Sequence, residues 1–263
     1  MKHILITHEK GGCGVTTTAT NVAYLLAQKG LRVLLVDLES RGDCATAFGL
    51  DPAPVLAVWL ADCAVGRDVD GDLVRFARAG IDVMPTNSSG LRSALSLIDG
   101  YDDGVVRGWL RDLGDGYDVV LYDAKAASGA LRRIVLGLAD LLVIPTRLEA
   151  FGLAEIVPVV EQYTQAGGDP AHVVILPVAV RKLQVHAYNY GLLKEAFGDR
   201  VWVSVPDRVA VPESQSLQSP VCEYAPDNDA SLAYRGVAAG VYGLLFREAE
   251  GTVEGVGDGQ TIR

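Results

Sequence analysis

A short glycine-rich segment near the N-terminus has the residue types that bind phosphate groups. Residues 10–17 read KGGCGVTT. The glycines allow successive backbone N–H groups to point at phosphate oxygens, and a hydroxyl at the start of the next helix, here Thr16, can ligate a metal ion. Such loops normally carry a lysine just before that hydroxyl, but here the residue is Val15. The segment predicts a phosphate site without its usual cation, and a structural strand-to-helix turn is the alternative.

Three carboxylates follow apolar runs elsewhere in the chain. Asp37 and Glu39 come after VLLV (33–36), and Asp123 comes after VVLY (119–122). Open α/β sheets bind ligands beyond the carboxyl ends of their strands, so we expect these side chains to lie beside the glycine loop. Capping of the following segment is the alternative role for each of the two aspartates.

The pattern of apolar runs predicts a scaffold that brings these residues to one edge. A strand at 3–7, a helix over 16–29 and a strand at 31–38 form a βαβ unit, which implies a parallel sheet with a right-handed crossover. The same alternation resumes after the middle of the chain. Further strands are predicted at 117–123, 140–146, 171–180 and 200–206, and further helices at 127–139, 150–166, 186–197 and 228–248.

The middle of the chain is less regular, with a strand predicted at 81–85 and helices around 54–63 and 103–113. Continuous apolar strands separated by helices are typical of a sheet covered on both faces. We therefore predict the α/β fold class: a single domain with a doubly wound, mostly parallel sheet and helices on both faces. We place this domain at residues 1–248 and interpret the acidic, glycine-rich residues 249–263 as a disordered tail.

The composition excludes several classes of protein. Hydrophobic residues make up 49% of the 263 residues, enough for a large core, yet no apolar run reaches the roughly 18 residues of a membrane-spanning helix. The loop begins by Gly11, too soon for a secretory signal. The four cysteines form no CxxC pair, which favours free thiols in a reducing cytoplasm over a zinc site. The net charge of −10 disfavours a large basic surface that binds the phosphates of nucleic acid.

Several segments together resemble the ParA family of Walker-type ATPases, of which MinD is a relative. That family's loop reads KGGxGKT[ST], and residues 10–17 match it everywhere except at Val15. The resemblance covers about residues 1–248 and implies a fold like that of the P-loop NTPases. Its other segments are VLLVDLESRGDCATAFGL (33–50), YDVVLYDAKAASGAL (117–131), LADLLVIPTRLEAFGLAEI (138–156) and VPDRVAVPESQSLQSPVCEY (205–224).

The resemblance implies a role for each matching residue. Lys10 matches the signature lysine that reaches the partner subunit's nucleotide, and Glu39 matches the residue that positions the attacking water. Asp37 matches a carboxylate that lies near the metal ion and the loop, and Thr16 and Asp123 match the residues that hold Mg²⁺. The residues implied in nucleotide binding are those of the loop and three of the base pocket: Gly11, Gly12, Cys13, Gly14, Val15, Thr16, Thr17, Arg181, Pro206 and Asp207. Cys13 could instead be a packing residue, and Arg181 an ordinary surface arginine.

The same resemblance implies a cytoplasmic homodimer that closes on ATP and Mg²⁺. Such proteins partition or position cargo, as in chromosome or plasmid segregation, and a ParB-like or cargo-adaptor protein stimulates their turnover. We expect no MinD-like membrane role, because the acidic tail lacks a basic amphipathic helix. Nonspecific DNA binding has weak support, because the available cations alternate with acids: Lys182, Lys194, Arg200, Arg208, Arg235 and Arg247.

Departures from the family's pattern leave two functions open. Val15 removes a charge-assisted hydrogen bond that contributes roughly 1.5–3 kcal/mol, or about 10- to 150-fold in affinity. We therefore expect weakened ATP binding and slow or absent hydrolysis in a ParA-like switch. The alternative is a nucleotide-independent pseudo-ATPase that acts as a dimeric scaffold or adaptor. The other departures are Arg41, Asp43, Ala124, Lys125 and Ala126, and the sequence does not show whether Lys125 replaces the missing lysine.

Overall fold

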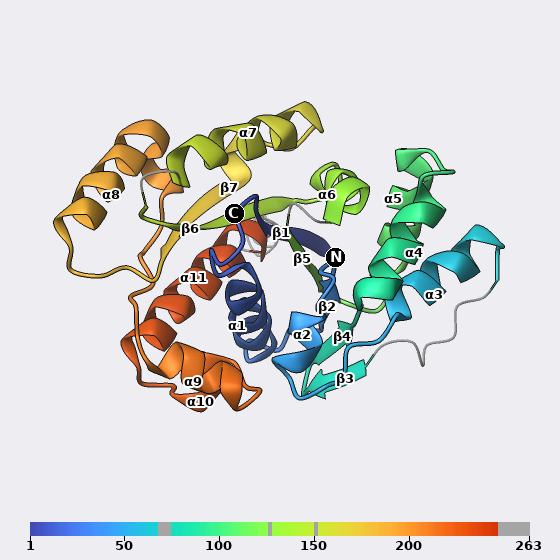
Figure 1. Ribbon diagram of the computed structural model, residues 1–263, viewed down its shortest axis with the longest axis horizontal. Coiled ribbons are helices and arrows are strands. Elements are labelled where there is room, and N and C mark those ends of the chain that lie inside the picture. Colours follow the sequence, from blue (N-terminus) through green and yellow to red (C-terminus); the bar gives the residue numbers. More distant parts are fainter. Residues whose placement is uncertain (68–74, 126–127, 150–151, 247–263) are drawn as a thin grey trace, which may run out of the picture.

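The computed structural model describes residues 1–67, 75–125, 128–149 and 152–246. Within these residues, seven strands form one sheet in the order β3-β4-β2-β5-β1-β6-β7 (Figure 1). Only β3 runs antiparallel to its neighbour, and the other described pairs are parallel. The strands are β1 (Lys2–His8), β2 (Val33–Asp37), β3 (Arg75–Arg78), β4 (Ile81–Met84), β5 (Val119–Lys125), β6 (Leu141–Arg147) and β7 (Val173–Val178).

The central strands are apolar on both faces because helices cover both (Figure 1). In β2 every residue is buried, and successive side chains enter opposite cores: Leu34 packs in one cluster and Leu35 in the other. One cluster lies under α1 (Val15–Ala27), α2 (Asp43–Thr46), α9 (Ala210–Ser216), α10 (Val221–Tyr224) and α11 (Asp229–Phe246). The other lies under α3 (Val55–Ala64), α4 (Ser88–Ile98), α5 (Asp103–Asp112), α6 (Gly129–Leu136), α7 (Gly152–Gln165) and α8 (Gln184–Phe197).

This arrangement confirms the predicted fold class. The helices and strands predicted in the irregular middle region are also present, as α3, β4 and α5. The sequence pattern missed β3 and α4 there, and it missed the short helices α2, α9 and α10. The predicted tail at 249–263 lies outside the described residues. Among the described residues, no helix has both the length and the apolarity needed to cross a bilayer.

The prediction of a strand at 200–206 is wrong. This segment runs beside β7 but forms two isolated parallel bridges, Ile175 with Val201 and Val180 with Pro206. The physical reason lies in β7, where Pro177 has no N–H with which to continue the ladder. The backbone N–H groups of residues 202 and 205 donate to the carbonyls of residues 175 and 177 at 2.9 and 2.8 Å. Three residue steps along this segment, from 202 to 205, therefore match only two steps along β7, from 175 to 177. Regular pairing is lost as a result.

Candidate functional site

The glycine-rich loop joins β1 to α1 at the carboxyl edge of the sheet. β1 ends at His8 and α1 begins at Val15. Gly12 and Gly14 adopt the left-handed conformation, with φ of 79° and 78°, which other residues rarely take. Gly14 is the N-cap of α1, so the unpaired N–H groups of the first helical turn lie next to the loop.

A cavity of about 530 Å³ opens in front of this loop. That volume falls in the range of sites for small ligands. Because the cavity is open, the loop has not collapsed onto its own side chains. The wall formed by the loop and α1 consists of Gly12, Gly14, Val15, Thr16, Thr17, Thr20 and Asn21, and the facing wall includes Val205, Pro206, Asp207, Arg208, Val211 and Gln215.

Val15 packs into the apolar layer between α1 and the sheet. Its side chain is 1% exposed and belongs to the cluster that also holds α11. A lysine here would end in an ammonium group that a phosphate could bind, whereas an isopropyl group offers neither charge nor donor. The loop has therefore kept its backbone donors and lost its own cation.

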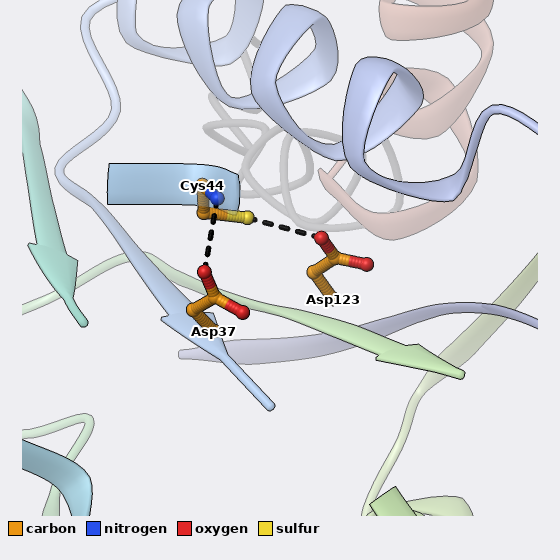
Figure 2. A group of neighbouring side chains, drawn as sticks. All are labelled: Asp37, Cys44 and Asp123. Atoms are coloured by element: carbon orange, nitrogen blue, oxygen red, sulfur yellow. Dashed lines mark hydrogen bonds between the residues drawn. The ribbon is translucent and has the colours of Figure 1, made fainter. Parts of the chain in front are cut away.

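Asp37, the last residue of β2, and Asp123, two residues before the end of β5, lie side by side as Cα partners in the register. Asp37 is fully buried, and its two oxygens accept backbone N–H groups from Glu39 and Cys44, each at 2.9 Å. The Cys44 thiol donates to Asp123 Oδ2 at 3.1 Å (Figure 2). The structure thus brings the two aspartates together beside the loop, as the sequence predicted.

The burial of this pair disfavours its charged forms. Burial raises the pKa of Asp37 well above its usual value, and the neighbouring charge of Asp123 raises it further. Burial also raises the pKa of Asp123 to about 6, although the positive charge of Lys125 opposes that shift. The Cys44 thiol, whose pKa burial raises as well, stays protonated and can act as a donor. A cation beside the aspartates favours their ionised forms.

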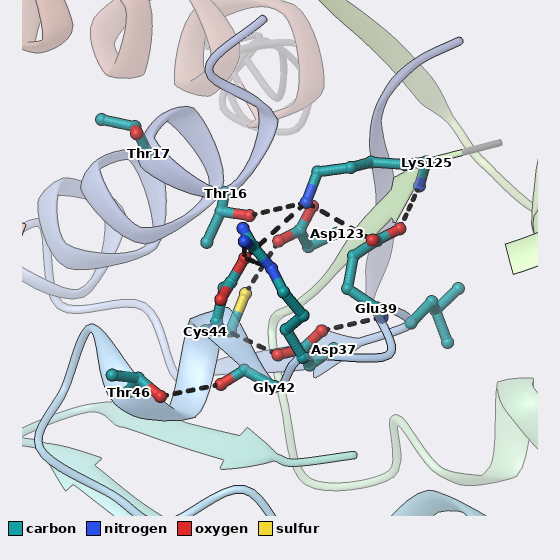
Figure 3. A network of polar contacts seen from close by, with 12 residues as sticks. Thr16, Thr17, Asp37, Glu39, Gly42, Cys44, Thr46, Asp123 and Lys125 are labelled. Atoms are coloured by element: carbon teal, nitrogen blue, oxygen red, sulfur yellow. Dashed lines mark hydrogen bonds and ion pairs between the residues drawn. The ribbon is translucent and has the colours of Figure 1, made fainter. Parts of the chain in front are cut away.

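Lys125 supplies such a cation from the end of β5. Its ammonium lies 3.5 Å from Thr16 Oγ1, 3.4 Å from Glu39 Oε2 and 3.9 Å from Asp43 Oδ2 (Figure 3). Burial alone would lower the pKa of Lys125, but the charges of Asp123 and Glu39 outweigh burial and raise it. Lys125 is also among the residues that line the cavity. A positive charge therefore stands next to the loop, although it does not come from the loop.

Glu39 is held on both of its carboxylate oxygens. Oε1 accepts the backbone N–H of Lys125 at 2.7 Å and the hydroxyl of Ser128 at 3.2 Å, and Oε2 faces the ammonium. The residue is 6% exposed. As it lies, Glu39 is engaged by its own chain and is not free to orient a water molecule.

The residues assigned to magnesium are Thr16, Asp37 and Asp123. One feature fits a cation: Asp123 Oδ1 is buried and has no hydrogen-bond partner among the described residues. However, the Lys125 ammonium lies 3.5 Å from the Thr16 hydroxyl, the group that would ligate the metal. As these side chains lie, an ammonium takes the place of a metal, and the site does not fit Mg²⁺.

Lys10 lies outside the cavity lining and points to its own chain. Its ammonium pairs with Glu149 Oε2 at 2.9 Å, and its side chain is 41% exposed. The hydrogen bond that Lys10 donates to Glu149 raises the pKa of Lys10. Glu149 also faces Arg147 at 3.5 Å. The lysine expected to reach across a dimer is thus held by an acid within the same subunit.

The three residues predicted for a base pocket fall in two places. Pro206 and Asp207 line the main cavity. Arg181 lies beside it, in a hollow of about 110 Å³ shared with Arg147 and Glu149, and its Nε donates to Asp207 Oδ2 at 2.6 Å. Cys13 is 3% exposed, and burial raises the pKa of its thiol, which agrees with a packing role.

Sequence reasoning missed several residues that shape the site. Cys44 and Ser128 hold the carboxylates in place, and Gln215 on α9 donates to Thr17 Oγ1 at 2.8 Å. Arg147 lines the cavity from the end of β6. Cys44 and Ser128 lie within segments that resemble the family's motifs, so their positions could have been singled out. Gln215 lies within 205–224, another of these segments, so its position could also have been singled out.

Comparisons with known proteins identify relatives over most of the chain. Residues 1–167 match the family model described as an AAA domain. Over 250 residues the chain is 30% identical to the chromosome-partitioning ATPase Soj of Thermus thermophilus, an alignment that covers 90% of this chain and 94% of Soj.

Two solved structures share the fold. A McdA variant from Cyanothece in complex with ATP has a TM-score of 0.76 at 21% identity and covers 93% of this chain and 96% of its own. The septum site-determining protein MinD of Pyrococcus horikoshii, complexed with Mg-ADP, has a TM-score of 0.75 at 18% identity and covers 95% and 99%. At these identities the likeness shows the fold alone.

Proposed function

This chain belongs to the ParA/MinD family of P-loop ATPases, and on that basis we propose that it is a nucleotide-dependent dimerisation switch. Its cargo is DNA or another cellular body that must be partitioned or positioned. The relative Soj is named for chromosome partitioning and MinD for determining the septum site. A ParB-like or adaptor protein would couple this switch to its cargo.

One observation carries the proposal: the loop remains open onto a cavity of ligand size. Gly12 and Gly14 hold the left-handed turn that such a loop requires, and α1 begins directly behind it. Backbone N–H groups at a helix N-terminus favour anions whatever side chain follows them. The loss of lysine at Val15 weakens this site without removing it.

Slow hydrolysis follows from two features of the same site. Val15 supplies no charge to the transferring phosphoryl group, and such charge accounts for much of the rate in phosphoryl transfer. Glu39, the candidate for positioning the attacking water, has both carboxylate oxygens engaged. Long-lived nucleotide-bound dimers are the expected result, with turnover stimulated by a partner protein.

A nucleotide-independent scaffold is the second candidate. The observation in its favour is that Val15 is buried in the core and Lys125 already neutralises part of the acidic cluster. In that case the cavity would be a remnant of the fold, and the dimer would form without any ligand. The two candidates differ in a single measurable property, the affinity for nucleotide.

Isothermal titration of the full chain with ATP separates the two functions. The switch requires one site per chain with a dissociation constant tighter than about 1 mM, which corresponds to roughly −4 kcal/mol. Gly12→Val should abolish the signal, because it strains a left-handed residue on the cavity wall. Gly108→Val, on α5 far from the loop, is the matched control. Absence of heat with the wild-type chain favours the scaffold.

Nonspecific DNA is not favoured as the direct ligand of this chain. Lys194 donates to the carbonyls of Gly198 and Val201, and Arg208 pairs with Asp229. Two of the cations available for phosphate contact are thus engaged within the chain, and Arg247 lies outside the described residues. A gel shift at low salt, with and without ATP, tests this: retardation that fades with salt would show DNA binding.

A further inference from the structure

We propose that the Lys125 ammonium binds the nucleotide phosphates from the place where the family resemblance put magnesium, so that nucleotide binding needs no divalent cation. The inference rests on the proposed nucleotide site. In the relatives, the loop lysine and the metal ion are expected to supply the positive charge that binds the phosphates. Here Lys125 of β5 would supply it.

The position of Lys125 follows from the sheet. In the register of β1 and β5 it is the partner of His8, the last residue of β1 before the loop. Its side chain therefore starts at the edge from which the loop departs, and its ammonium ends 3.5 Å from Thr16 Oγ1. Thr16 directly follows Val15, so the lost lysine and Lys125 would serve neighbouring points of one site (Figure 3).

The Lys125 ammonium forms ion pairs with Glu39 and Asp43, and the lengths of these pairs bear on whether it can also bind a phosphate. Charge-assisted N–H···O bonds are about 2.7–2.9 Å long, and Lys10 reaches Glu149 at 2.9 Å in this same chain. The Lys125 ammonium instead lies at 3.4 and 3.9 Å from the carboxylates of Glu39 and Asp43. The Lys125 side chain is 17% exposed, and Lys125 is among the residues that line the cavity. This is a position from which it can still bind an entering oxygen.

The charges around the cavity give Lys125 a distinct role. Of the other cations on the described lining, Arg41 pairs with Asp43, Arg147 with Glu149, and Arg208 with Asp229. The side chains of these three arginines are 41–78% exposed, whereas the Lys125 side chain is 17% exposed. Lys125 is thus the cation on the lining that water screens least, and it is the one beside Thr16.

Binding of a phosphate by Lys125 has a consequence for Glu39. Oε2 of Glu39 faces only this ammonium among its described partners, while Oε1 is held by Lys125 N–H and Ser128. A phosphate that draws the ammonium away leaves Oε2 without its partner. Nucleotide binding would therefore prepare one oxygen of Glu39 to accept a hydrogen bond from water.

The test is titration of ADP and ATP into the full chain, in buffer with EDTA and in buffer with Mg²⁺. We expect the wild-type affinities to agree within about threefold between the two buffers, because the ammonium replaces the metal. Lys125→Met should weaken binding in both buffers by roughly 10- to 150-fold, the range of one charge-assisted hydrogen bond. Lys29→Met, beyond the far end of α1, is the control and should bind as the wild type does.

The outcomes separate this inference from the proposed function. A wild-type chain that binds nucleotide only with Mg²⁺ overturns the inference and leaves the nucleotide switch intact. If Lys125→Met binds nucleotide as tightly as the wild type does, the inference is also overturned and the nucleotide switch also stays intact. A wild-type chain that binds in neither buffer overturns both. Because the wild-type comparison needs no substitution, the inference stays testable even where Lys125→Met fails to fold.

Discussion

Val15 is the residue that most changes the chemistry expected of this chain. The valine side chain lies at the start of α1, 1% exposed, between the cavity and the apolar cluster. A lysine there would keep its methylene groups in the apolar layer and extend its ammonium into the cavity, as long side chains do at interfaces. The position is therefore able to take the ordinary residue of the family.

Val15→Lys should raise ATP affinity by roughly 10- to 150-fold, because it restores one charge-assisted hydrogen bond. Phosphate release should also become faster, since the new charge acts on the transferring group. Titration calorimetry and a phosphate-release assay measure the two effects. Unchanged affinity and unchanged turnover would mean that the cavity does not receive a triphosphate, as the scaffold function requires.

His3 makes the stability of the chain depend on pH. Burial lowers the pKa of His3 from its ordinary 6.5 to about 4, and its Nδ1 lies 3.1 Å from the hydroxyl of the buried Tyr122. Between these two values the unfolded chain binds a proton that the folded chain does not. Stability is therefore lost as pH falls below about 6.5, and the loss levels off below about 4.

The expected loss between pH 7.5 and pH 5 is about 2 kcal/mol in the free energy of unfolding. Urea unfolding at the two pH values measures it. His3→Gln removes the titrating group, so the variant should lose about 2 kcal/mol less than the wild type over that interval. Equal losses for the two proteins would contradict the assignment to His3.

At the residue scale, the sequence predicts the place of a residue in the fold better than it predicts where its side chain points. Asp37 and Asp123 could be placed together because the ends of adjacent parallel strands meet at one edge. The partners of Lys125 could not, because a flexible four-carbon side chain points where packing and charge allow. The same holds for Lys10, whose bond to Glu149 depends on how the end of β6 meets the loop.

Among the elements, the turn between β2 and α2 holds the carboxylates in position. Gly42 is the N-cap of α2 with φ of 69°, and α2 provides the Cys44 N–H that binds Asp37. A Cβ at this glycine would lie 2.5 Å from Pro52 Cβ and 2.6 Å from the Thr86 carbonyl oxygen. The turn therefore requires glycine both for its backbone conformation and for space.

Gly42→Ala should lower the free energy of unfolding by at least about 1–3 kcal/mol, the range for a strained left-handed residue. Thermal or urea unfolding measures the change. Gly108→Ala is the matched control: it lies within α5, no atom is within 4 Å of its added Cβ, and its φ is not positive. That control should be neutral or slightly stabilising. Equal effects of the two substitutions would show that the turn tolerates a side chain.

Elements with continuous apolar runs could be predicted from the sequence, and elements set by tertiary contacts could not. All five of the strands β1, β2, β5, β6 and β7 were expected, and each is buried except for at most one terminal residue. The segment 200–206 has a similar run, but the proline at position 177 of its neighbour prevents a regular ladder. α4 begins at an Asn87 cap, whose side chain accepts the Gly90 N–H at 2.8 Å. Asparagine is a preferred residue at this position, so the start of α4 could have been predicted from the sequence.

For the whole molecule, the decisive contact is the pair between Lys10 and Glu149. Within one subunit it competes with any reach of Lys10 toward a partner's nucleotide. Both side chains are more than a third exposed, so solvent screens the pair and its contribution is small. The pair can therefore restrain dimerisation modestly without preventing it.

Glu149→Gln should strengthen nucleotide-dependent dimerisation by roughly 2- to 30-fold, because it frees Lys10 from an acid of its own chain in both subunits of the dimer. Sedimentation at several protein concentrations with ATP present gives the dimer dissociation constant. Glu161→Gln, an exposed acid on α7, serves as the control and should leave that constant unchanged. A weaker dimer in Glu149→Gln would mean that Glu149 itself belongs to the interface.

The mass of the particle in solution, measured by light scattering with and without ATP, tests the nucleotide switch most directly. One chain has a mass of 27.9 kDa. The switch predicts this mass without nucleotide, about twice this mass with ATP, and no doubling in Lys10→Ala. A particle of one-chain mass in every condition would contradict the switch, and so would a dimer that forms equally well with no nucleotide present.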